Sequence, residues 1–541
     1  MLLDRRSFLI SPGAAALLGA AAVPEMLRPP DHIAVQRENE LVRLGKQGKK
    51  WTSGDVEVTA DPNGNRIPVT LSAPKSGVSR IRLRWNTAIP EDVRILGDHW
   101  ERSYGDLEWR GHFPDRLLPW YFLTSRGGST AGYGVKTGAS AIAYWQADPA
   151  GFTLWLDVRN GGSPVQLGER TLLAATAVME RSKPGESAIA FGRRFCKVMC
   201  EQPRLPLKPV YGGNNWYYTY GKDLSAAALL RDADLMAELS PSSENRPFLV
   251  LDMGWTAQRD GAGPIEKLAP GFSDMAELAE KIKAKRVRPG IWVRPLLTME
   301  SLPQGLRLSS KAPFSIYDPS APDALARIEA DMKTISGWGY EMIKHDFTTY
   351  DITGRWGFQM GPELTGSGWH FADRSKTTAE VIAGMYAAIR KGAGESLLIG
   401  CNTVGHLGAG LFELQRIGDD TSGREWSRTR KMGVNTLAFR MAQHNTFFAA
   451  DADCVPLTAA IPWNLSKQWL DLVARSGTPL FVSADPAITG EKEQAAVRTA
   501  FATAAKVQHG LEPLDWMETT VPMRWKGEKG ITEYRWYEDE R

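Results

Sequence analysis

Acidic residues follow several apolar runs of this 541-residue chain, and their types and positions suit acid–base chemistry. The segment "EMIKHDF" places Asp346 at the end of one run, and the segment "RIGDD" places Asp419 and Asp420 at the end of another. Two carboxylates over one pocket are the minimum for cleaving a glycosidic bond, because one attacks the anomeric carbon or activates water and the other protonates the leaving oxygen. We therefore treat these aspartates as candidate catalytic residues and expect the separation of about 5–5.5 Å that is typical of a retaining enzyme.

Lys344 precedes Asp346 by two residues, so both side chains face the same side of the predicted strand. A lysine at this position lowers the pKa of the aspartate, keeps a nucleophilic carboxylate ionised and can donate to a substrate hydroxyl. The alternative is a simple structural ion pair. His345 points to the opposite face, where a structural role is expected.

Asp419 and Asp420 are adjacent, and two like charges repel each other. Repulsion with partial burial raises the pKa of one carboxyl group, as a general acid requires, while Arg416 can hold the other as an anion. The alternative is that one of the two acids caps the helix expected in the segment "SGREWSRTRKM".

These acids need a scaffold that brings separate strand ends together. Eight apolar runs, separated by helical stretches, occur between residues 206 and 510: "PVYGGNNW", "PFLVLDMGW", "RPGIWVRPL", "YEMIKHDF", "SLLIGCN", "ELQRIGDD", "HNTFFAADAD" and "TPLFVSAD". This rhythm predicts a (β/α)8 TIM barrel, whose carboxyl-terminal strand ends form the catalytic face. Most runs end in a polar residue, which favours an enzyme, although an aspartate there can also cap the next helix.

Smaller units surround the predicted barrel in a multidomain chain. Alternating segments rich in aromatic and β-branched residues predict an antiparallel β-sandwich over residues 51–205, preceded by a polar linker at 25–50. Two short strand-like segments predict a C-terminal β-module at 511–541.

Residues 1–24 have the features of a twin-arginine export signal. Arg5 and Arg6 precede a short apolar stretch that ends in small residues. This pattern predicts a periplasmic or secreted protein, and the alternative is an amphipathic start with two adjacent arginines.

Composition and charge restrict the expected partners. A net charge of +3 gives no reason to expect nucleic acid or a membrane as partner. The four cysteines form neither a zinc pattern nor a CxxC motif, so neither a metal nor a cofactor is expected. Trp216, Trp255 and Trp292 follow or end predicted strands, where flat rings can stack on a pyranose, so a carbohydrate is the expected partner.

The ordered motifs resemble a known group of enzymes. The set "LDMGW", "IWVRP", "IKHDF", "IGCN" and "RIGDDTS", behind a β-domain that contains "GDHWERSYGDLEW", resembles retaining α-galactosidases of glycoside hydrolase family 36, with family 27 as a relative. The resemblance covers roughly residues 50–510. It implies that Asp346 is the nucleophile and Asp419 the acid/base, with Asp420 as the alternative because an alignment of the family 27 type, started from Arg416, reaches one residue further.

The same resemblance implies a sugar-binding set around these acids. Asp252 matches an aspartate that holds sugar hydroxyls, and Trp216, Arg294, Lys344 and Cys401 match positions that line the sugar subsite. Trp255, Trp292, Asn402 and Arg416, which lie at predicted strand ends, complete the expected substrate-binding residues.

One position departs from the family pattern. The family has two aspartates before Gly-Trp, whereas here Asp252 is followed by Met253. Loss of one charged hydrogen bond costs about 1.5–3 kcal/mol, so β-L-arabinopyranoside, which lacks the C6 hydroxyl, is an alternative substrate. A transglycosidase and a non-catalytic glycan-binding protein are further alternatives. A short C-terminal module leaves homo-oligomer formation open.

Overall fold

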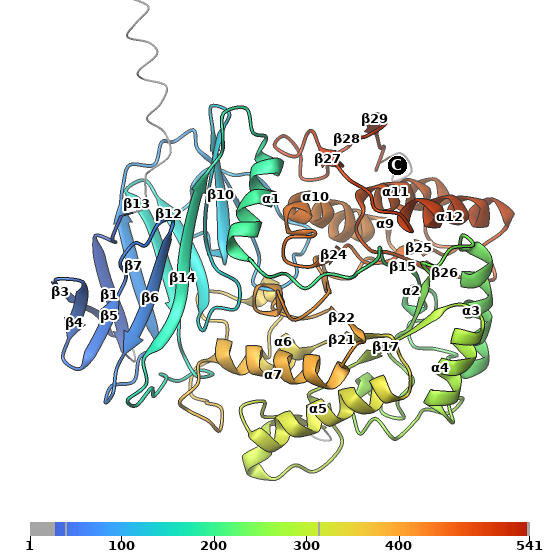
Figure 1. The fold of residues 1–541 in the computed structure, drawn as a ribbon, viewed down its shortest axis with the longest axis horizontal. Coiled ribbons are helices and arrows are strands. Elements are labelled where there is room, and N and C mark those ends of the chain that lie inside the picture. The colour runs from blue at the N-terminus through green and yellow to red at the C-terminus, as the bar shows by residue number, and fades with distance from the viewer. Residues whose placement is uncertain (1–27, 38–39, 312–313, 538–541) are drawn as a thin grey trace, which may run out of the picture.

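The computed structural model describes residues 28–37, 40–311 and 314–537. Two antiparallel sheets lie at one end of the molecule and a parallel sheet ringed by helices at the other (Figure 1). The predicted export signal at 1–24 lies outside the described residues. None of the described helices is both long and apolar enough to cross a bilayer.

The two antiparallel sheets pack face to face through aromatic rings. Phe122 and Tyr133 of the eight-stranded sheet lie 5.4 Å and 4.9 Å, between ring centres, from Phe152 of the six-stranded sheet. Side chains alternate between buried and partly exposed along β6, as expected of strands with one face on a core. The six-stranded sheet contains β1 (His32–Arg37), β2 (Glu40–Arg43), β7 (Arg80–Asn86), β9 (Leu118–Pro119), β12 (Ile142–Asp148) and β13 (Gly151–Asp157), and the eight-stranded sheet contains β3 (Gly45–Gln47), β4 (Lys50–Ser53), β5 (Val56–Thr59), β6 (Arg66–Ser72), β8 (Arg94–Gly97), β10 (Tyr121–Arg126), β11 (Ser129–Val135) and β14 (Leu172–Arg181).

The stretch predicted as a linker, residues 25–50, contains strands of these sheets. β1 pairs antiparallel with β7, and its residues Ile33 and Val35 are completely buried. Only these two side chains form the period-two pattern of β1, and polar residues surround them, so the strand signal in the sequence is weak. The first sheet therefore starts well before residue 51.

The parallel sheet has nine strands in the order β24-β23-β22-β21-β17-β16-β15-β26-β25. β24 and β25, at its two ends, are separated in the chain only by residues 452–454, so the sheet curves round on itself as in a TIM-like barrel. Each of the eight predicted runs contains a strand. The strands are β15 (Tyr211–Asn214), β16 (Phe248–Leu251), β17 (Arg288–Val293), β21 (Met342–His345), β22 (Leu397–Gly400), β23 (Leu414–Arg416), β24 (Ala449–Asp451), β25 (Val455–Leu457) and β26 (Leu480–Ala484).

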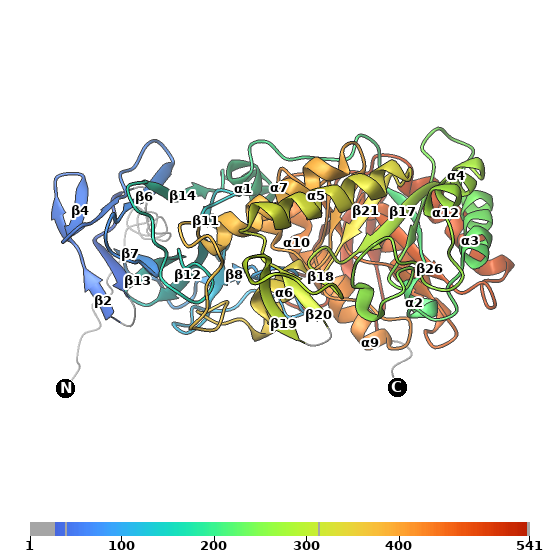
Figure 2. The same ribbon diagram turned by 90° about the horizontal axis from the view of Figure 1, so that it is seen from below.

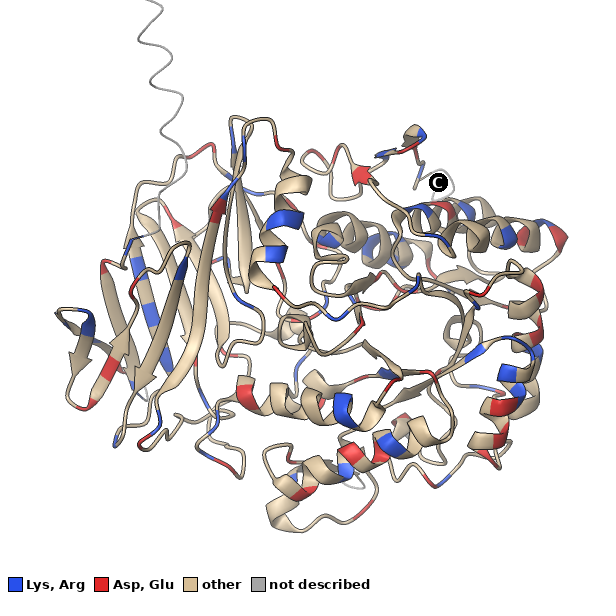
Figure 3. Cartoon of the chain, in the orientation of Figure 1, with Lys and Arg blue, Asp and Glu red and all other residues tan. Residues whose placement is uncertain are grey.

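Helices cover the outside of the parallel sheet (Figure 1). A capping box, in which Thr377 accepts from the Glu380 amide and Glu380 accepts from the Thr377 amide, starts α7. Lysine and arginine alternate with aspartate and glutamate along the outer helices, with neither sign dominating (Figure 3). The helices are α1 (Ala188–Met199), α2 (Trp216–Thr219), α3 (Ala226–Leu239), α4 (Met275–Ala284), α5 (Pro322–Gly337), α6 (Thr348–Thr353), α7 (Thr378–Ala393), α8 (Gly405–Gly408), α9 (Trp426–Thr429), α10 (Thr436–Arg440), α11 (Trp463–Ser476) and α12 (Glu491–Ala504).

Two small antiparallel sheets complete the described chain. One follows β17 and lies beside α6 in Figure 2; it contains β18 (Leu297–Thr298), β19 (Arg307–Lys311) and β20 (Phe314–Tyr317). The other lies near the C-terminus and contains β27 (Glu512–Pro513), β28 (Arg524–Gly527) and β29 (Gly530–Glu533).

A segment of the N-terminal part, residues 98–106, reaches the end of β23. The Ser103 amide donates to the Ile417 carbonyl at 2.9 Å, and the Asp419 amide donates to the Ser103 carbonyl at 2.8 Å. Arg440 pairs with Asp98 at 2.7 Å and anchors the same segment. The N-terminal part therefore contacts the strand end that carries the adjacent acids.

Candidate active site

Asp346 directly follows β21, and three neutral donors hold its carboxylate. Oδ1 accepts from the backbone amides of Phe347 at 2.7 Å and Asn402 at 2.9 Å, and Oδ2 accepts from Nε1 of Trp292 at 3.1 Å. Phe347 has φ of 62°, so the chain turns sharply and α6 starts at the next residue. The carboxylate is thereby fixed at the end of the strand, with the Asp346 residue 8% exposed.

The charge state of Asp346 follows from opposing effects. Burial raises its pKa, whereas Arg102 and Lys344 lower it, and the pKa lies below its ordinary value. Asp346 is therefore an anion near neutral pH, as a nucleophilic carboxylate must be. Arg102 was not among the residues predicted from the sequence.

Lys344 pairs directly with Asp252 rather than with Asp346. Its Nζ lies 2.7 Å from Oδ2 of Asp252, which also accepts from Nδ2 of Asn214 at 2.7 Å. Burial lowers the pKa of Lys344, but Asp252 raises it well above its ordinary value, so the lysine is charged. Lys344 thus acts on Asp346 through its field, and the predicted Asp252 belongs to the same buried network.

Asp419 and Asp420 are held by different sets of arginines. Asp419 pairs with Arg102 at 2.8 Å and Arg428 at 2.7 Å, and its side chain is 14% exposed. Asp420 pairs with Arg416 at 3.2 Å and Arg102 at 3.6 Å, and its side chain is 40% exposed. Asp420 is therefore the more accessible of the two carboxylates.

The raised pKa expected of one adjacent acid is not found at Asp420. Burial raises its pKa, but Arg416, Arg102 and Lys344 lower it to about 2. Asp420 in turn is a like charge that raises the pKa of Asp346. Since the N-cap of α9 is Glu425, neither adjacent acid caps that helix.

Arg102 connects the N-terminal part of the chain to both acids. It is 5% exposed and lies over the Trp356 ring at 5.3 Å. Burial lowers its pKa, but Asp419 and Asp420 raise it well above the ordinary value, so Arg102 carries its charge at the site. The conspicuous segment "GDHWERSYGDLEW" contains this residue, but no spacing rule connects it with acids more than 300 residues away.

Glu101 supports the same region from beside Arg102. Its carboxylate accepts from Nδ2 of Asn402 and, at 2.8 Å, from the Gly357 amide, and burial raises its pKa. Asn402 is completely buried, and its Oδ1 accepts from the Tyr350 amide at 2.9 Å. Asn402 is thus engaged with Asp346, Glu101 and Tyr350 within the protein, and its substrate-binding role stays a prediction.

Two further predicted substrate-binding residues have their polar groups engaged within the protein. Trp255 is 1% exposed and donates to the Trp292 carbonyl at 2.8 Å, so it supports Trp292 instead of presenting a ring face. Arg294 forms a two-bond ion pair with Asp351, at 3.0 and 2.6 Å. Trp255 comes four residues after β16 and Arg294 directly follows β17, and periodicity alone did not show which way they turn.

Arg416 and Cys401 lie beneath the adjacent acids. Arg416 is 1% exposed and pairs with Asp453 at 2.8 Å in addition to Asp420, as expected for a residue that holds one acid as an anion. Cys401 Sγ lies 3.6 Å from Nη1 of Arg416, and burial and Asp346 raise the pKa of the thiol well above its ordinary value. Cys401 is therefore a neutral thiol close to both Asp346 and Arg416.

Aromatic and apolar side chains border this charged centre. Trp216, the first residue of α2, and Met253, which follows β16, are both half-buried. His345 is completely buried against Phe412, at 4.7 Å between ring centres, and burial lowers its pKa to about 3. His345 is a neutral core residue, as predicted.

The site combines an ionised carboxylate on β21 with a second, more exposed carboxylate after β23, and charged lysine and arginine side chains lie around both. Among the described residues, no group of three or more His, Cys, Asp and Glu side chains is arranged to hold a metal ion. This arrangement can stabilise an attacking carboxylate, exchange a proton at a second one and bind hydroxyl groups.

Comparison with known proteins identifies relatives by structure only. Neither protein-family models nor curated sequences gave a match. An α-galactosidase from Thermus thermophilus, in complex with p-nitrophenyl α-D-galactopyranoside, matches with a TM-score of 0.60 at 15% identity, over 93% of this chain and 99% of that chain. A family 36 α-galactosidase from Geobacillus stearothermophilus, in complex with 1-deoxygalactonojirimycin, matches with a TM-score of 0.53 at 15% identity, over 88% of this chain and 75% of that chain.

An α-galactosidase from Lactobacillus brevis gives a similar result, with a TM-score of 0.55 at 12% identity over 88% of this chain and 70% of that chain. The structural neighbours therefore include family 36 α-galactosidases, the group that the motifs resemble. At these identities the likeness establishes a shared fold, and the chemistry has to be argued from the site.

Proposed function

We propose that this chain is a retaining, exo-acting glycoside hydrolase of the α-galactosidase type. The observation that carries the proposal is the position of Asp346: an ionised carboxylate fixed by Trp292 and Asn402 at the end of β21, with Asp420 close enough to influence its pKa. The same fold in solved α-galactosidases supports this reading.

In the first step, Asp346 attacks the anomeric carbon and forms a glycosyl ester while the bond to the leaving oxygen breaks and that oxygen receives a proton from the acid. In the second step the same acid, now an anion, takes a proton from water, the water oxygen attacks the anomeric carbon, and the Asp346 carboxylate is released. The sugar keeps its anomeric configuration after two inversions.

We assign the proton transfers to Asp420 rather than to Asp419. Each acid pairs with two arginines, but the Asp420 side chain is 40% exposed whereas the Asp419 side chain is 14% exposed. Arg416 and Arg102 hold Asp420 as an anion in the free protein, so substrate hydroxyls must replace part of these contacts before Asp420 takes up a proton.

We infer the preferred sugar from Asp252, which pairs with Lys344, and from Met253, the residue after it. Asp252 offers a buried carboxylate to sugar hydroxyls, and Met253 follows where a second carboxylate would bind the C6 hydroxyl. An α-galactoside is the proposed substrate, and a β-L-arabinopyranoside tests whether Met253 has removed the requirement for C6. We further propose export by the twin-arginine signal at 1–24.

The decisive test is a panel of aryl glycosides with the wild type and Asp346→Ala. We expect turnover of the α-galactoside or the β-L-arabinopyranoside, and a loss on the order of 10⁴–10⁶-fold in the variant. Azide should restore turnover by Asp346→Ala and give a glycosyl azide of inverted configuration, because the small anion enters the space that the carboxylate leaves. Full activity of Asp346→Ala on every glycoside of the panel would refute the assignment.

A further inference from the structure

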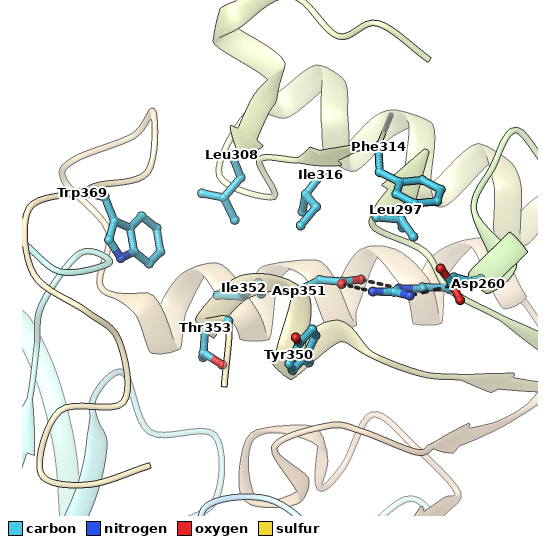
Figure 4. A pocket seen from close by; sticks show the side chains of 12 residues that line it. Asp260, Leu297, Leu308, Phe314, Ile316, Tyr350, Asp351, Ile352, Thr353 and Trp369 are labelled. Atoms are coloured by element: carbon cyan, nitrogen blue, oxygen red, sulfur yellow. Dashed lines mark hydrogen bonds and ion pairs between the residues drawn. The ribbon is translucent and has the colours of Figure 1, made fainter. Parts of the chain in front are cut away.

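A cavity of about 410 Å³ lies beside the proposed catalytic centre. Figure 4 shows its two walls, with the small sheet β18–β20 on one side and α6 on the other. Trp369 closes one end. Its size is within the range of sites that bind small organic molecules, about 300–1,000 Å³.

The walls of this cavity are mainly apolar. Leu297, Leu308, Phe314 and Ile316 face it from the small sheet, and Ile352 faces it from α6 (Figure 4). A sugar ring in this position would bury hydroxyl groups against carbon atoms and lose hydrogen bonds to water. The lining therefore suits an apolar group better than a second sugar.

The polar residues that line the cavity are Asp260, which is exposed, Tyr350, Thr353 and the buried pair Arg294–Asp351. Arg294 and Asp351 neutralise each other in a pair whose side chains are 10% and 1% exposed. The Thr353 hydroxyl lies within hydrogen-bonding distance of the carbonyls of Thr349, at 2.8 Å, and Arg355, at 3.0 Å. A ligand in the cavity thus meets a fixed, neutral ion pair and needs no charge of its own.

The cavity approaches Asp346 through Arg294 and Phe347, and it approaches Asp420 through Tyr350, Trp356 and Arg102. Arg294 lies over the Phe347 ring at 4.2 Å, and Phe347 is the residue after Asp346. Tyr350, which lines the cavity, stacks on Trp356 at 4.5 Å between ring centres. Arg102 lies over that same Trp356 and pairs with Asp419 and Asp420.

Building on the proposed function, we propose that this cavity is the subsite for the aglycone, the group that leaves from the sugar, and that it selects glycosides with an apolar, flat aglycone. The substrate class is then aryl or similar hydrophobic glycosides rather than oligosaccharides. Leu308 and Phe314 are the specificity-determining residues, because they line the cavity from the small sheet without contacting the acids.

The test compares substrates of one sugar that differ only in the leaving group. Leu308→Trp should fill the cavity, and Phe314→Ala should remove one wall. We expect kcat/KM for the 4-methylumbelliferyl glycoside to fall at least about tenfold in both variants, while kcat/KM for the glycosyl fluoride, which has no aglycone, stays within about twofold. Leu514→Trp is the matched control, since Leu514 is an exposed leucine outside the cavity.

Turnover of the fluoride also separates the two proposals. A wild-type protein that cleaves no glycosyl fluoride would overturn the proposed function itself. The other outcome concerns the ratio of kcat/KM for the umbelliferyl glycoside to kcat/KM for the fluoride. If the wild type cleaves the fluoride and this ratio is the same in Leu308→Trp and Phe314→Ala as in the wild type, only the aglycone subsite is overturned. Unchanged fluoride turnover in the variants shows that they are folded.

Discussion

Asp346 and the pair Asp419–Asp420 are held in different ways. Neutral donors fix Asp346. They are the amide of the next residue, Phe347, the indole of Trp292 on β17 and the amide of Asn402 after β22. Arginines hold the adjacent acids, and one of them, Arg102, comes from the N-terminal part of the chain. The hydrogen bonds to the Asp346 carboxylate therefore come from the barrel alone, whereas the ion pairs of the adjacent acids are completed by another region.

The two kinds of contact control different properties: hydrogen bonds set the position of a carboxylate, and ion pairs set its pKa. Hydrogen bonds from backbone amides and an indole set where the Asp346 oxygens lie, and they do so at any pH at which the carboxylate is ionised. Ion pairs set how readily the acids take up protons, because each nearby positive charge lowers a carboxyl pKa. The N-terminal part of the chain, through Arg102, thus lowers the carboxyl pKa values of Asp346 and Asp420.

Among the variants that test this difference between the two sides of the site, Asp420→Asn should lower kcat/KM most. If Asp420 is the general acid, kcat/KM falls on the order of 10³-fold for an alkyl glycoside, whose leaving group needs a proton, and far less for a dinitrophenyl glycoside. The measurement is kcat/KM for a series of glycosides of one sugar with leaving groups of different pKa.

Asp419→Asn is the matched variant for this series. Since Asp419 is enclosed by Arg102 and Arg428, its loss should lower all rates by a similar factor and leave the dependence on the leaving group unchanged. A steeper dependence for Asp419→Asn than for Asp420→Asn would transfer the acid role to Asp419.

Arg102→Met should have an intermediate effect, about 10²-fold in kcat/KM. Arg102 lowers the pKa of Asp346, and activity is lost as the pH falls through that pKa. Removing the arginine raises the pKa, so the acid limb of the profile of kcat/KM against pH should move to higher pH. A structural role alone would lower the rate without moving this limb.

Arg126→Met provides the control for the arginine variant. Arg126 also belongs to the N-terminal part and pairs with an acid, Asp92, but that pair is exposed. Its removal should leave both the rate and the acid limb unchanged, because solvent screens the charge.

The barrel side of the site was predictable and the contribution from the N-terminal part was not. Asp346, Lys344 and Asp420 occupy strand ends that local apolar runs reveal, so their convergence follows from the parallel sheet. Arg102 comes close only because residues 98–106 pair with the chain after β23, and no periodicity encodes a contact over such a separation.

Directions of side chains beyond the strand ends were also hidden. Trp255 lies four residues past the end of β16, where period two no longer applies, and Arg294 is the first residue after β17. Their partners Trp292 and Asp351 decide which way they turn. The start of the first sheet was missed because β1 offers few apolar residues amid polar neighbours. Sequence patterns therefore predict the position of an acid at a strand end more readily than the charged neighbours that set its pKa.

Asp331 on α5 sharpens the same comparison with the smallest effect, since here burial outweighs the arginine. Arg327 lies 2.8 Å from Asp331, yet burial raises the pKa of this acid to about 7. The unfolded chain, in which the pKa is about 3.9, releases this proton at lower pH, so the free energy of unfolding falls as the pH rises from about 4 to about 7.

Asp331→Asn should remove this loss, which is on the order of 2 kcal/mol between about pH 5 and about pH 8. The measurement is urea unfolding of both proteins at the two pH values, with Asp234→Asn, an exposed partner of Lys285, as control. The difference in unfolding free energy between Asp331→Asn and the wild type should grow with pH, whereas a difference that shrinks would mean that the ion pair with Arg327 dominates.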